Sequence, residues 1–501
     1  MKRAAIVMAF TLAGCAKLLG LDPTTQVECM VCGTDTCVDL QTDSNHCGDC
    51  STMCNADETC VSGQCASAAP CESGTTEACY TGAANTKGVG PCHGGTRTCT
   101  NSHWGACEGE VVPSLDICGD TIDQDCSGAA DDPVDADGDG YTTCEGDCCD
   151  APGQGCADPT LVNPGAYDVA GNNYDDDCNA KIDDATTCDM TLASNTALPT
   201  ELAQAIDLCK TTTDPGKGWG LISATLSLAD GTGAPNPNQH SVRPMFGAYT
   251  PRAGSQLLVL SNGTAAATGQ MNPMFMPFQM GTQFMTMSPY PADWFTANNN
   301  KVPVTPGCPA PVANTANDPA MLTLRIRVPV NAKSFRLGVD YMTAEFPEFL
   351  CSAYNDEALV LLDSTWKGTP ANPLDKNIAT YKDASGTHLL DSNLGKTTAL
   401  FHDCKLPPTQ CLVMPQGSCA GDAMLLGTGF ETADTTSCSA TPTEMGASTG
   451  WLVARGNVVG GEVITLRIVI WDSSDQIYDS LALLDDFEWS PDSVTPGTTR
   501  E

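Results

Sequence analysis

Aspartate residues recur at short intervals between Asp116 and Asp189, a stretch with 20 acidic residues and a single basic one, Lys181. At its centre lies Asp135-Ala-Asp-Gly-Asp-Gly-Tyr141, in which carboxylates alternate with residues that favour tight turns. Two carboxylates held ~6 Å apart repel by roughly 3 kcal/mol at an effective dielectric of about 20. Calcium, which takes oxygen ligands in loops of this kind, would offset that repulsion. The spacing therefore predicts a calcium site.

The predicted ligands come from three parts of this stretch. Gly146 stands at loop position twelve, where a regulatory EF-hand has its bidentate Glu, so the closing carboxylates must come from further along the chain. The alternative is a solvated acidic linker that binds no metal. The predicted ligands are Asp135, Asp137, Asp139, Tyr141 through its carbonyl, Asp147, Asp150, Asp123, Asp125, Asp175, Asp176 and Asp177.

A second constellation consists of thioethers. Thioether sulfur suits copper(I), although methionine also fills irregular gaps or forms an adhesive loop. The gap-filling or adhesive role is favoured here, and copper(I) binding is the alternative. The residues concerned are Met271, Met274, Met276, Met280, Met285 and Met287.

The candidate catalytic motifs lie in sequence contexts that do not support catalysis. The segment from Gly446 to Gly450 fits the pattern G-x-S-x-G, but it leads into a predicted strand, whereas a nucleophile elbow leads from a strand into a helix. The six histidines include no H-E-x-x-H motif. Glu345 and Glu348 could act as a glycosidase pair, but such a pair also suits calcium or solvent. We therefore predict a non-catalytic protein, with an exported hydrolase as a further alternative.

The N-terminus predicts export. A basic start at Met1 is followed by an apolar run from Ala4 to Gly14, the layout of a signal peptide, and the run is too short to span ~30 Å of hydrocarbon. The run ends in Leu-Ala-Gly-Cys15, which resembles the lipobox of bacterial lipoproteins. That resemblance implies cleavage before Cys15, its acylation with chains such as palmitate, and, because Ala16 is not Asp, an outer-membrane location on the periplasmic or the external face. A chance cysteine after an ordinary signal peptide is the alternative.

Charge limits the possible partners. The chain carries 61 acidic and 23 basic residues, a formal net charge of −38, and has no cluster of Lys and Arg. Nucleic acid is therefore excluded as an expected partner. The partners that we expect are the membrane, through the lipid anchor, and an unidentified surface ligand that is a protein or a glycan.

Cysteine arithmetic also indicates an oxidising compartment. Of 29 cysteines, acylation of Cys15 would leave 28, an even number that permits complete disulfide pairing. Thirteen lie within Cys29–Cys107, eight within Cys118–Cys188 and seven from Cys209 onward. Because the last group is odd, full pairing needs a bridge across its boundary, and Cys188 with Cys209 is a candidate. Zinc at the C-x-x-C pairs is a less favoured alternative to disulfides.

The acidic stretch from Ile117 to Asp184 resembles the MopE-type metal-binding repeat, and its central loop is similar to thrombospondin type 3 loops. The resemblance rests on Cys-bounded Asp runs before and after that loop. It departs from the family at Cys149, where Asp is usual, and at Ala170, where Cys is usual. These departures leave the ligand count and the disulfide pairing open.

From Thr191 onward the pattern indicates strands. Leu322, Leu324 and Ile326 alternate with polar residues, which predicts half-buried strands, and residues 335–341 repeat this pattern. One helix is expected at Thr200–Lys210. Many strands and a single helix favour a β-sandwich. Further strands are expected at Leu221–Leu228, Leu257–Ser261, Leu359–Asp363, Trp451–Arg455, Val463–Trp471 and Leu481–Trp489.

Three ordered motifs in this region resemble the choice-of-anchor L domain. They begin at Glu345, Ser448 and Tyr478, and the similarity covers about Thr191 to Pro491. The resemblance implies a surface-displayed domain with no established catalytic role. We expect its loops at Glu345–Asp356 and Asp472–Asp486 to form an exposed binding face, because function is commonly placed on loops over a rigid scaffold.

The predicted fold is mainly β, with a jelly-roll-like C-terminal β-sandwich after small disulfide-rich modules and an Asp-rich metal-binding segment. The expected function is that of a calcium-binding cell-surface or periplasm-facing lipoprotein with an adhesion head. The predicted organisation is a signal peptide (1–14), a lipidated tether (15–28), Cys-rich modules (29–66 and 67–115), the metal-binding repeat region (116–189), the sandwich (190–492) and a tail (493–501).

Overall fold

The structure is a computed structural model. It describes residues 29–31, 37–39, 47, 52, 58–61 and 64–67, and then 71–500 except 101–102, 115–117, 125, 131–134, 151–155, 157, 184–186, 281, 313, 348, 385, 405–422, 432, 435–442 and 445. The predicted lipidation site Cys15, the predicted ligand Asp125 and Glu348 lie outside the described residues. The chain divides into two compact units, Met1–Pro133 and Val134–Glu501.

The first unit consists of short antiparallel hairpins. Such small pieces bury little apolar surface, so covalent bridges must supply much of their stability. Three of these bridges are Cys71–Cys99, Cys79–Cys107 and Cys92–Cys126. This part of the predicted fold, small disulfide-rich modules, is confirmed. The strand pairs are β1 (Cys29–Val31) with β2 (Cys37–Asp39), β3 (Glu58–Val61) with β4 (Gln64–Ser67), and β5 (Thr76–Cys79) with β6 (Gly95–Thr100), which also pairs with β7 (His103–Trp104).

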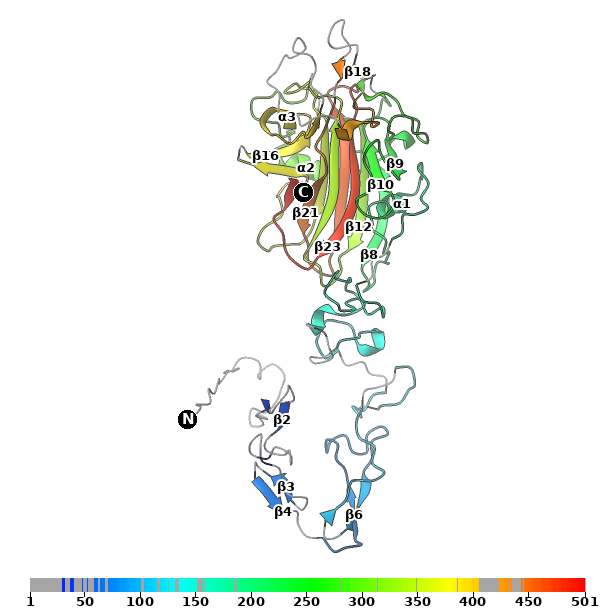
Figure 1. Cartoon of the computed structure of the whole chain (residues 1–501), viewed down its shortest axis with the longest axis vertical. Helices are drawn as coiled ribbons and strands as arrows, with labels where there is room; N and C mark the ends of the chain where they lie inside the picture. Colours follow the sequence, from blue (N-terminus) through cyan, green and yellow to red (C-terminus); the bar gives the residue numbers. More distant parts are fainter. Residues whose placement is uncertain are drawn as a thin grey trace. The chain divides into compact units, whose positions relative to one another are not determined.

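The second unit is built on one curled sheet of 15 strands that folds into two layers (Figure 1). The first layer contains β8 (Gly220–Ser227), β12 (Ala316–Arg327), β22 (Val463–Ser473) and β14 (Glu357–Asp363). The second contains β9 (His240–Arg243), β10 (Leu257–Ser261), β23 (Ser480–Ser490), β13 (Ser334–Thr343), β21 (Leu452–Asn457) and β24 (Gly497–Arg500). β16 (Gly386–Asp391) and β15 (Thr380–Asp383) connect the layers. The predicted β-sandwich is confirmed.

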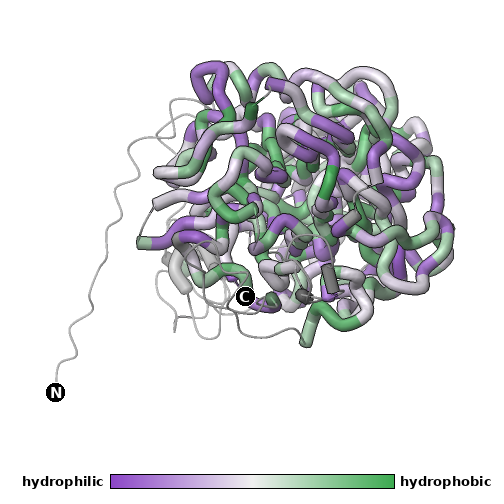
Figure 2. The backbone as a smooth tube through the Cα atoms, turned by 90° about the horizontal axis from the view of Figure 1, so that it is seen from above, coloured by the Kyte–Doolittle hydropathy of each residue, from purple (hydrophilic) through white to green (hydrophobic). Residues whose placement is uncertain are grey.

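Smaller elements complete the unit. Two-residue strands are β11 (Met287–Ser288), β17 (Asp403–Cys404), β18 (Ala433–Asp434), β19 (Thr443–Glu444) and β20 (Ala447–Ser448). The α-helices are α1 (Pro199–Gln204), α2 (Ala292–Ala297) and α3 (Leu394–Thr397). Five 3₁₀ turns are described, at Thr143–Glu145, Pro159–Leu161, Pro237–Gln239, Phe278–Met280 and Ala423–Leu425. Hydrophilic and hydrophobic stretches alternate along the backbone drawn in Figure 2.

The core has an inner part between the layers and two outer parts. Along β23, Ala482 and Leu484 point into the inner core, while Leu481 and Leu483 belong to an outer cluster with Phe246. On the outside of the first layer, α2 contributes its tryptophan to a third cluster. Because connecting segments cover both outer faces, β13 is buried along nearly its whole length. The prediction of half-buried strands is therefore wrong for β13, although the second half of β12 alternates as expected.

All the individually predicted strands are present, with ends shifted by a few residues. The predicted helix at Thr200–Lys210 is shorter, because α1 ends at Gln204. Asp207 has a left-handed φ of 68°, which a continuing helix does not permit. Ala205 and Ile206, which follow the helix, remain buried. The apolar pattern therefore predicted the burial of these residues correctly but predicted too long a helix.

An ion-pair network fixes α2 to the outer face of the first layer. The Asp293 carboxylate accepts hydrogen bonds from Arg467 Nη1 at 2.9 Å and Nη2 at 2.6 Å, and from Lys376 Nζ at 2.7 Å. Burial would raise the pKa of Asp293, but the hydrogen bonds from these two cations outweigh burial and lower it. The ionised carboxylate thus stabilises the native packing of α2.

We expect Asp293→Asn to lower the free energy of unfolding at neutral pH by about 1–2 kcal/mol, since the charged groups are only partly buried. Because the native pKa lies below the unfolded value of about 3.9, this contribution is present above the unfolded pKa and is lost as the pH falls through the native pKa. Urea denaturation between about pH 7 and pH 3 measures it. The exposed Asp492→Asn is the control. A difference from wild type that does not shrink on acidification would contradict the assignment.

Candidate metal centre

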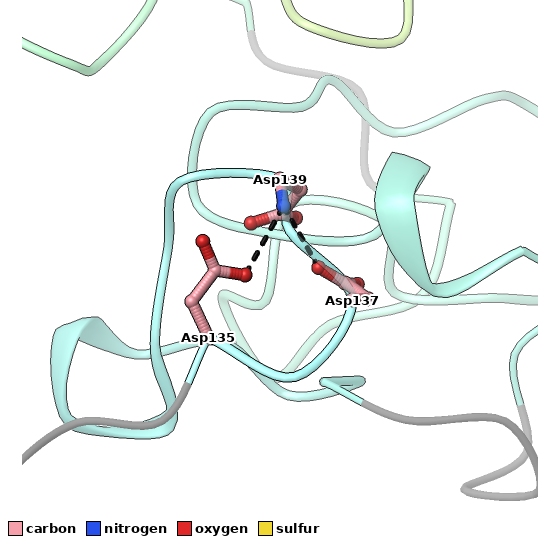
Figure 3. A group of neighbouring side chains, drawn as sticks. All are labelled: Asp135, Asp137 and Asp139. Carbon is pink, nitrogen blue, oxygen red and sulfur yellow. Dashed lines mark hydrogen bonds between the residues drawn. The ribbon is translucent and has the colours of Figure 1, made fainter. Parts of the chain in front are cut away.

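The Asp135 loop is organised by its own backbone N–H groups. Asp135 Oδ1 accepts from Gly138 N at 2.6 Å and Asp139 N at 3.1 Å, and its Oδ2 accepts from Gly140 N at 2.9 Å. Asp137 Oδ1 accepts from Asp139 N at 3.0 Å, and the two bonds to Asp139 N are drawn in Figure 3. Gly138 and Gly140 have positive φ values of 82° and 92°, which explains the glycines of the motif. The loop thereby turns its carboxylates towards one another.

Two overlapping groups of carboxylates result. Asp135, Asp137 and Asp139 can each offer an oxygen within 4.8 Å of the others, and Asp137, Asp147 and Asp150 form a second such group. Asp137 is common to both groups. The loop lacks the closing Glu of an EF-hand, and Asp147 and Asp150 are the acids that lie beside the loop in its place. Oxygen-only donor sets of this kind suit hard cations such as calcium or magnesium.

Part of this donor set has no hydrogen-bond donor among the described residues. Asp147 is only 6% exposed, and its Oδ1 accepts from Cys149 N at 2.8 Å, while no described group donates to its Oδ2. Asp137 Oδ2 is likewise buried with no donor among the described residues. A buried carboxylate oxygen without a donor or a cation is unfavourable. These oxygens lie within the second group, so a bound cation would satisfy them.

Electrostatics in the loop disfavour the ionised, metal-free state. Burial, with help from the carboxylates of Asp139 and Asp137, raises the pKa of Asp147 to about 6. Burial also raises the pKa of Asp137 and of Asp139. A divalent cation reverses this tendency, because it favours the deprotonated form of each ligand.

The predicted carbonyl ligand is part of a packed corner. The Tyr141 ring lies under Lys217 Nζ, 5.2 Å from the ring centroid, and Lys217 also donates to Gly140 O at 2.6 Å and to Glu145 at 2.7 Å. Asn163 Nδ2 donates to Asp139 Oδ2 at 2.6 Å. These contacts fix the C-terminal side of the loop. The role of the Tyr141 carbonyl as a ligand stays a prediction.

The later acids form a separate group with a member that sequence reasoning missed. Asp175 and Asp177 meet Asp168, and the three can offer oxygens within 4.8 Å of one another. Asp168 Oδ1 accepts from Asp176 N at 2.8 Å, which brings it to its partners. Lys210 Nζ lies 3.4 Å from Asp177 Oδ2 and supplies positive charge. This group therefore needs a metal less than the Asp137 group does.

Asp176 and Asp123 belong to none of these groups among the described residues, and both accept hydrogen bonds that shape turns. Asp176 Oδ2 accepts from Val169 N at 3.0 Å and Asn172 Nδ2 at 2.7 Å, so it braces the turn before the cluster. Asp123 accepts from the backbone N–H groups four and five residues later, at 3.0 and 3.1 Å. Asp175 accepts in the same pattern, at 3.0 and 2.8 Å. The two Cys-bounded turns that the sequence repeats thus share one backbone design, and Asp123 lies in the other compact unit from the Asp137 group.

The acidic segment is attached to the sandwich. Disulfides Cys148–Cys178 and Cys149–Cys156 close it internally, and Cys188–Cys209 joins it to α1's end of the sandwich, which confirms the bridge expected from cysteine parity. Val330 N donates to Gly165 O at 2.9 Å, next to the start of β13. The predicted boundary at 189/190 therefore lies inside one compact unit.

Comparison with known proteins finds no matching family model, no matching curated protein and no matching solved structure. The disulfides in both units indicate an oxidising compartment, extracellular or periplasmic. Among the described helices, none has the length and apolar character needed to cross a membrane.

The Met-rich connection is mostly exposed. The side chains of Met271, Met274, Met276, Met285 and Met287 are 42–72% exposed, and that of Met280 lies outside the described residues. Gap filling in the core is therefore not the role of these five. An adhesive surface and copper(I) binding both stay predictions.

Ser448, the central residue of the G-x-S-x-G match, is fully buried. It donates to Asp340 Oδ1 at 2.8 Å, and its Oγ lies 2.6 Å from the Tyr249 hydroxyl. A serine enclosed in this way serves packing of the second layer. This environment gives the hydrolase alternative no support.

The exposure expected for the two loops of the binding face is wrong for most of their residues, and their role in binding stays a prediction. In Glu345–Asp356 and Asp472–Asp486 most of the described side chains are buried, including Glu345, Asp356, Asp472 and Asp479. A groove of about 610 Å³ elsewhere on the sandwich offers an accessible concave surface. Its lining includes Asn298, Asp375, Lys382, Thr387 and Thr499. Sequence reasoning missed it because the lining comes from separate loops and from the strands β15, β16 and β24, which share no motif.

We expect Asp137→Asn to weaken calcium binding at the loop by about tenfold or more, or ~1.4 kcal/mol, because it removes a negative ligand common to two groups. Calorimetry on the full-length oxidised protein, first stripped with chelator, measures the change. Asp158→Asn is a matched control, since Asp158 lies in the same segment, is exposed, belongs to none of the carboxylate groups found among the described residues, and its carboxylate accepts from Thr160 Oγ1. Equal calcium affinity in both variants would contradict the assignment of Asp137 as a calcium ligand.

Proposed function

We propose that this chain is a non-catalytic, lipid-anchored protein of the outer membrane, facing the cell surface or the periplasm. Calcium at the Asp137 groups would brace the acidic segment against a β-sandwich head. The head would bind a protein or glycan ligand and so serve adhesion. The disulfides and the bound metal would then hold the sandwich in a fixed conformation in which it presents its binding surface to the ligand.

The observation that carries this proposal is that two sets of three aspartates share Asp137. A solvated acidic linker has no reason to bury Asp147 at 6% exposure with a free oxygen, or to direct five carboxylates to one place. Rigid attachment to the sandwich gives calcium a structural task, because the loop contacts Lys217 of the head segment. Calcium therefore fits a bracing role better than a signalling role.

The groove supports the binding part of the proposal. Its volume of about 610 Å³ lies within the ~300–1,000 Å³ typical of ligand sites. The lining side chains Asn298, Asp375, Lys382 and Thr387 offer both hydrogen-bond donors and acceptors. Such a surface suits the hydroxyl groups of a glycan or a polar peptide segment. Ordered loops and strands form its walls, so little reorganisation would oppose binding.

Copper(I) capture is the second candidate. The observation in its favour is that five thioethers are exposed in one connection rather than used in the core. Soft thioether ligands that remain accessible could collect a soft cation. Replacing the six methionines with Leu should abolish copper(I) binding if this role is correct.

We expect lipidation of Cys15 to be essential for membrane attachment. Several acyl chains anchor a protein stably in a membrane, and the polypeptide without them has no such anchor. We predict that cells producing the chain incorporate labelled palmitate into it and that Cys15→Ser abolishes both the label and sedimentation with membranes. Cys188→Ser, which alters a bridge instead, should keep the label. Palmitate that persists in Cys15→Ser would contradict the lipobox assignment.

Filling the groove should abolish ligand binding. We expect cells that display Thr387→Trp to lose attachment to protein- or glycan-coated surfaces, whereas cells with Thr225→Trp, a change at an exposed position of β8 outside the groove, should attach as wild type does. Attachment should also fall when calcium is removed with chelator. Attachment that is indifferent to the groove variant would refute this binding site.

A further inference from the structure

The lysine of helix α3 lies against a disulfide instead of a carboxylate. Although the chain carries 61 acidic residues, Lys396 forms no ion pair with any Asp or Glu among the described residues. Its Nζ lies 2.8 Å from Cys351 Sγ, 3.1 Å from Cys308 Sγ and 3.4 Å from Pro306 O. Cys308 and Cys351 are bonded to each other. A positive charge is thus directed at both sulfurs of one bridge.

This charge favours the open form of the bridge over the closed form. Cysteine sulfur is only a weak hydrogen-bond acceptor, so an ammonium gains little from an intact disulfide. A thiolate beside an ammonium is strongly stabilised, as at reactive cysteines next to Lys or Arg. Because exchange is faster when the departing sulfur is a stable thiolate, the position of Lys396 Nζ suits a disulfide that opens readily.

The bridge is accessible from solvent. Cys308 and Cys351 are both partly exposed, and the residues directly before and after Cys308 are exposed. By contrast, the bridge Cys92–Cys126 joins cysteines that are only 1% and 3% exposed. Disulfide exchange requires a thiolate to reach one of the two sulfurs. A small thiol can therefore reach Cys308 Sγ, and the ammonium beside it attracts the anionic form of that thiol.

We propose that Cys308–Cys351 is a thiol–disulfide exchange site whose reaction partner is a low-molecular-weight thiol, and that Lys396 stabilises the thiolate that leaves. The exchange site needs neither calcium nor a ligand in the groove, so it is independent of the proposed function. Its reductant, the small thiol, comes from the surroundings of the protein.

The reaction has two steps. The thiolate of the small molecule attacks Cys308 Sγ and forms a mixed disulfide, while the S–S bond breaks and its electron pair leaves on Cys351 Sγ, the sulfur nearer to Lys396 Nζ. A second small thiolate then attacks the outer sulfur of the mixed disulfide, which releases the oxidised small molecule and the Cys308 thiolate. The two small thiols lose two electrons and two protons, and the two cysteines gain them.

Opening of the bridge affects its two sides differently. Cys351 N donates to Asn393 Oδ1 at 2.6 Å, and Asn393 is fully buried. Cys308 N donates to Thr305 O at 3.0 Å, a bond within its own turn. Cleavage therefore leaves Cys351 attached to the sandwich and loosens the turn that contains Cys308.

The loosened turn continues into one wall of the groove. Residues 303–306 line the groove, and Cys308 follows them by two positions. The other lining residues include parts of β15, β16 and β24, which the bridge does not join. Reduction should therefore loosen one wall of the groove while the strands that form the others stay paired.

The first test treats the full-length oxidised protein with reduced glutathione under native conditions. Free cysteines are alkylated at intervals and located by peptide mass spectrometry. We expect Cys308 and Cys351 to be labelled at least about tenfold faster than Cys92 and Cys126, with a transient glutathione adduct on Cys308. Hydrogen exchange should then rise in peptides covering residues 303–308. Equal labelling rates at the two bridges would overturn the exchange site, and unchanged hydrogen exchange would overturn the loosening of the wall.

The second test removes the charge. Lys396→Gln should slow opening of the bridge by about tenfold, whereas Lys396→Arg, which keeps the charge, should open nearly as fast as wild type. Lys301→Gln is the matched control, because Lys301 is an exposed lysine in the connection that contains Cys308. A variant that folds poorly would open its bridge faster, so slower opening reports the lost charge. Equal rates in Lys396→Gln and Lys301→Gln would refute the proposal.

Discussion

The shortage of cations is the constraint on which the rest of this structure depends. With 61 acidic and 23 basic residues, the fold cannot pair each carboxylate with a Lys or Arg. Backbone N–H groups take over part of that task in the acidic turns, where Asp123, Asp135 and Asp175 each accept two or three of them. Where a true ion pair does occur, as at Asp293, it joins a helix to the sheet. In the part of the chain that the structure describes, some buried carboxylate oxygens have neither solution, among them Asp137 Oδ2 and Asp147 Oδ2 beside the Asp135 loop.

Disulfide bridges stabilise the first unit, and packing of the sheet stabilises the second. The first unit has short hairpins and relies on disulfides, because its strands are too small to enclose a core. In the second unit the two layers bury an extended apolar interior, and outer clusters cover β13 and β23 on their other side. Such double coverage packs the sheet on both faces, and this packing supports both the groove lined by β15, β16 and β24 and the acidic segment that is bonded near the start of β13.

Local patterns predicted much of this arrangement. Alternation in β12, the apolar runs of β10 and β22, and the Asp-Gly spacing of the Asp135 loop are properties of a few consecutive residues, and the structure contains the corresponding elements. Asp168 was missed because only the fold brings it to Asp175 and Asp177. The double burial of β13 was missed because the segments that cover it have no periodicity. Helix α1 was predicted too long because an apolar face continues past its end into a buried turn.

The buried carboxylates of Asp356 and Asp472 illustrate why charge is a poor guide to exposure in this chain. Asp and Glu are almost never fully buried unless they are paired, so the segments that contain Asp356 and Asp472 read as exposed loops. The buried Asp356 carboxylate joins residues 94 and 124 positions away in sequence, Asn262 and Ser480, and no local motif encodes that meeting.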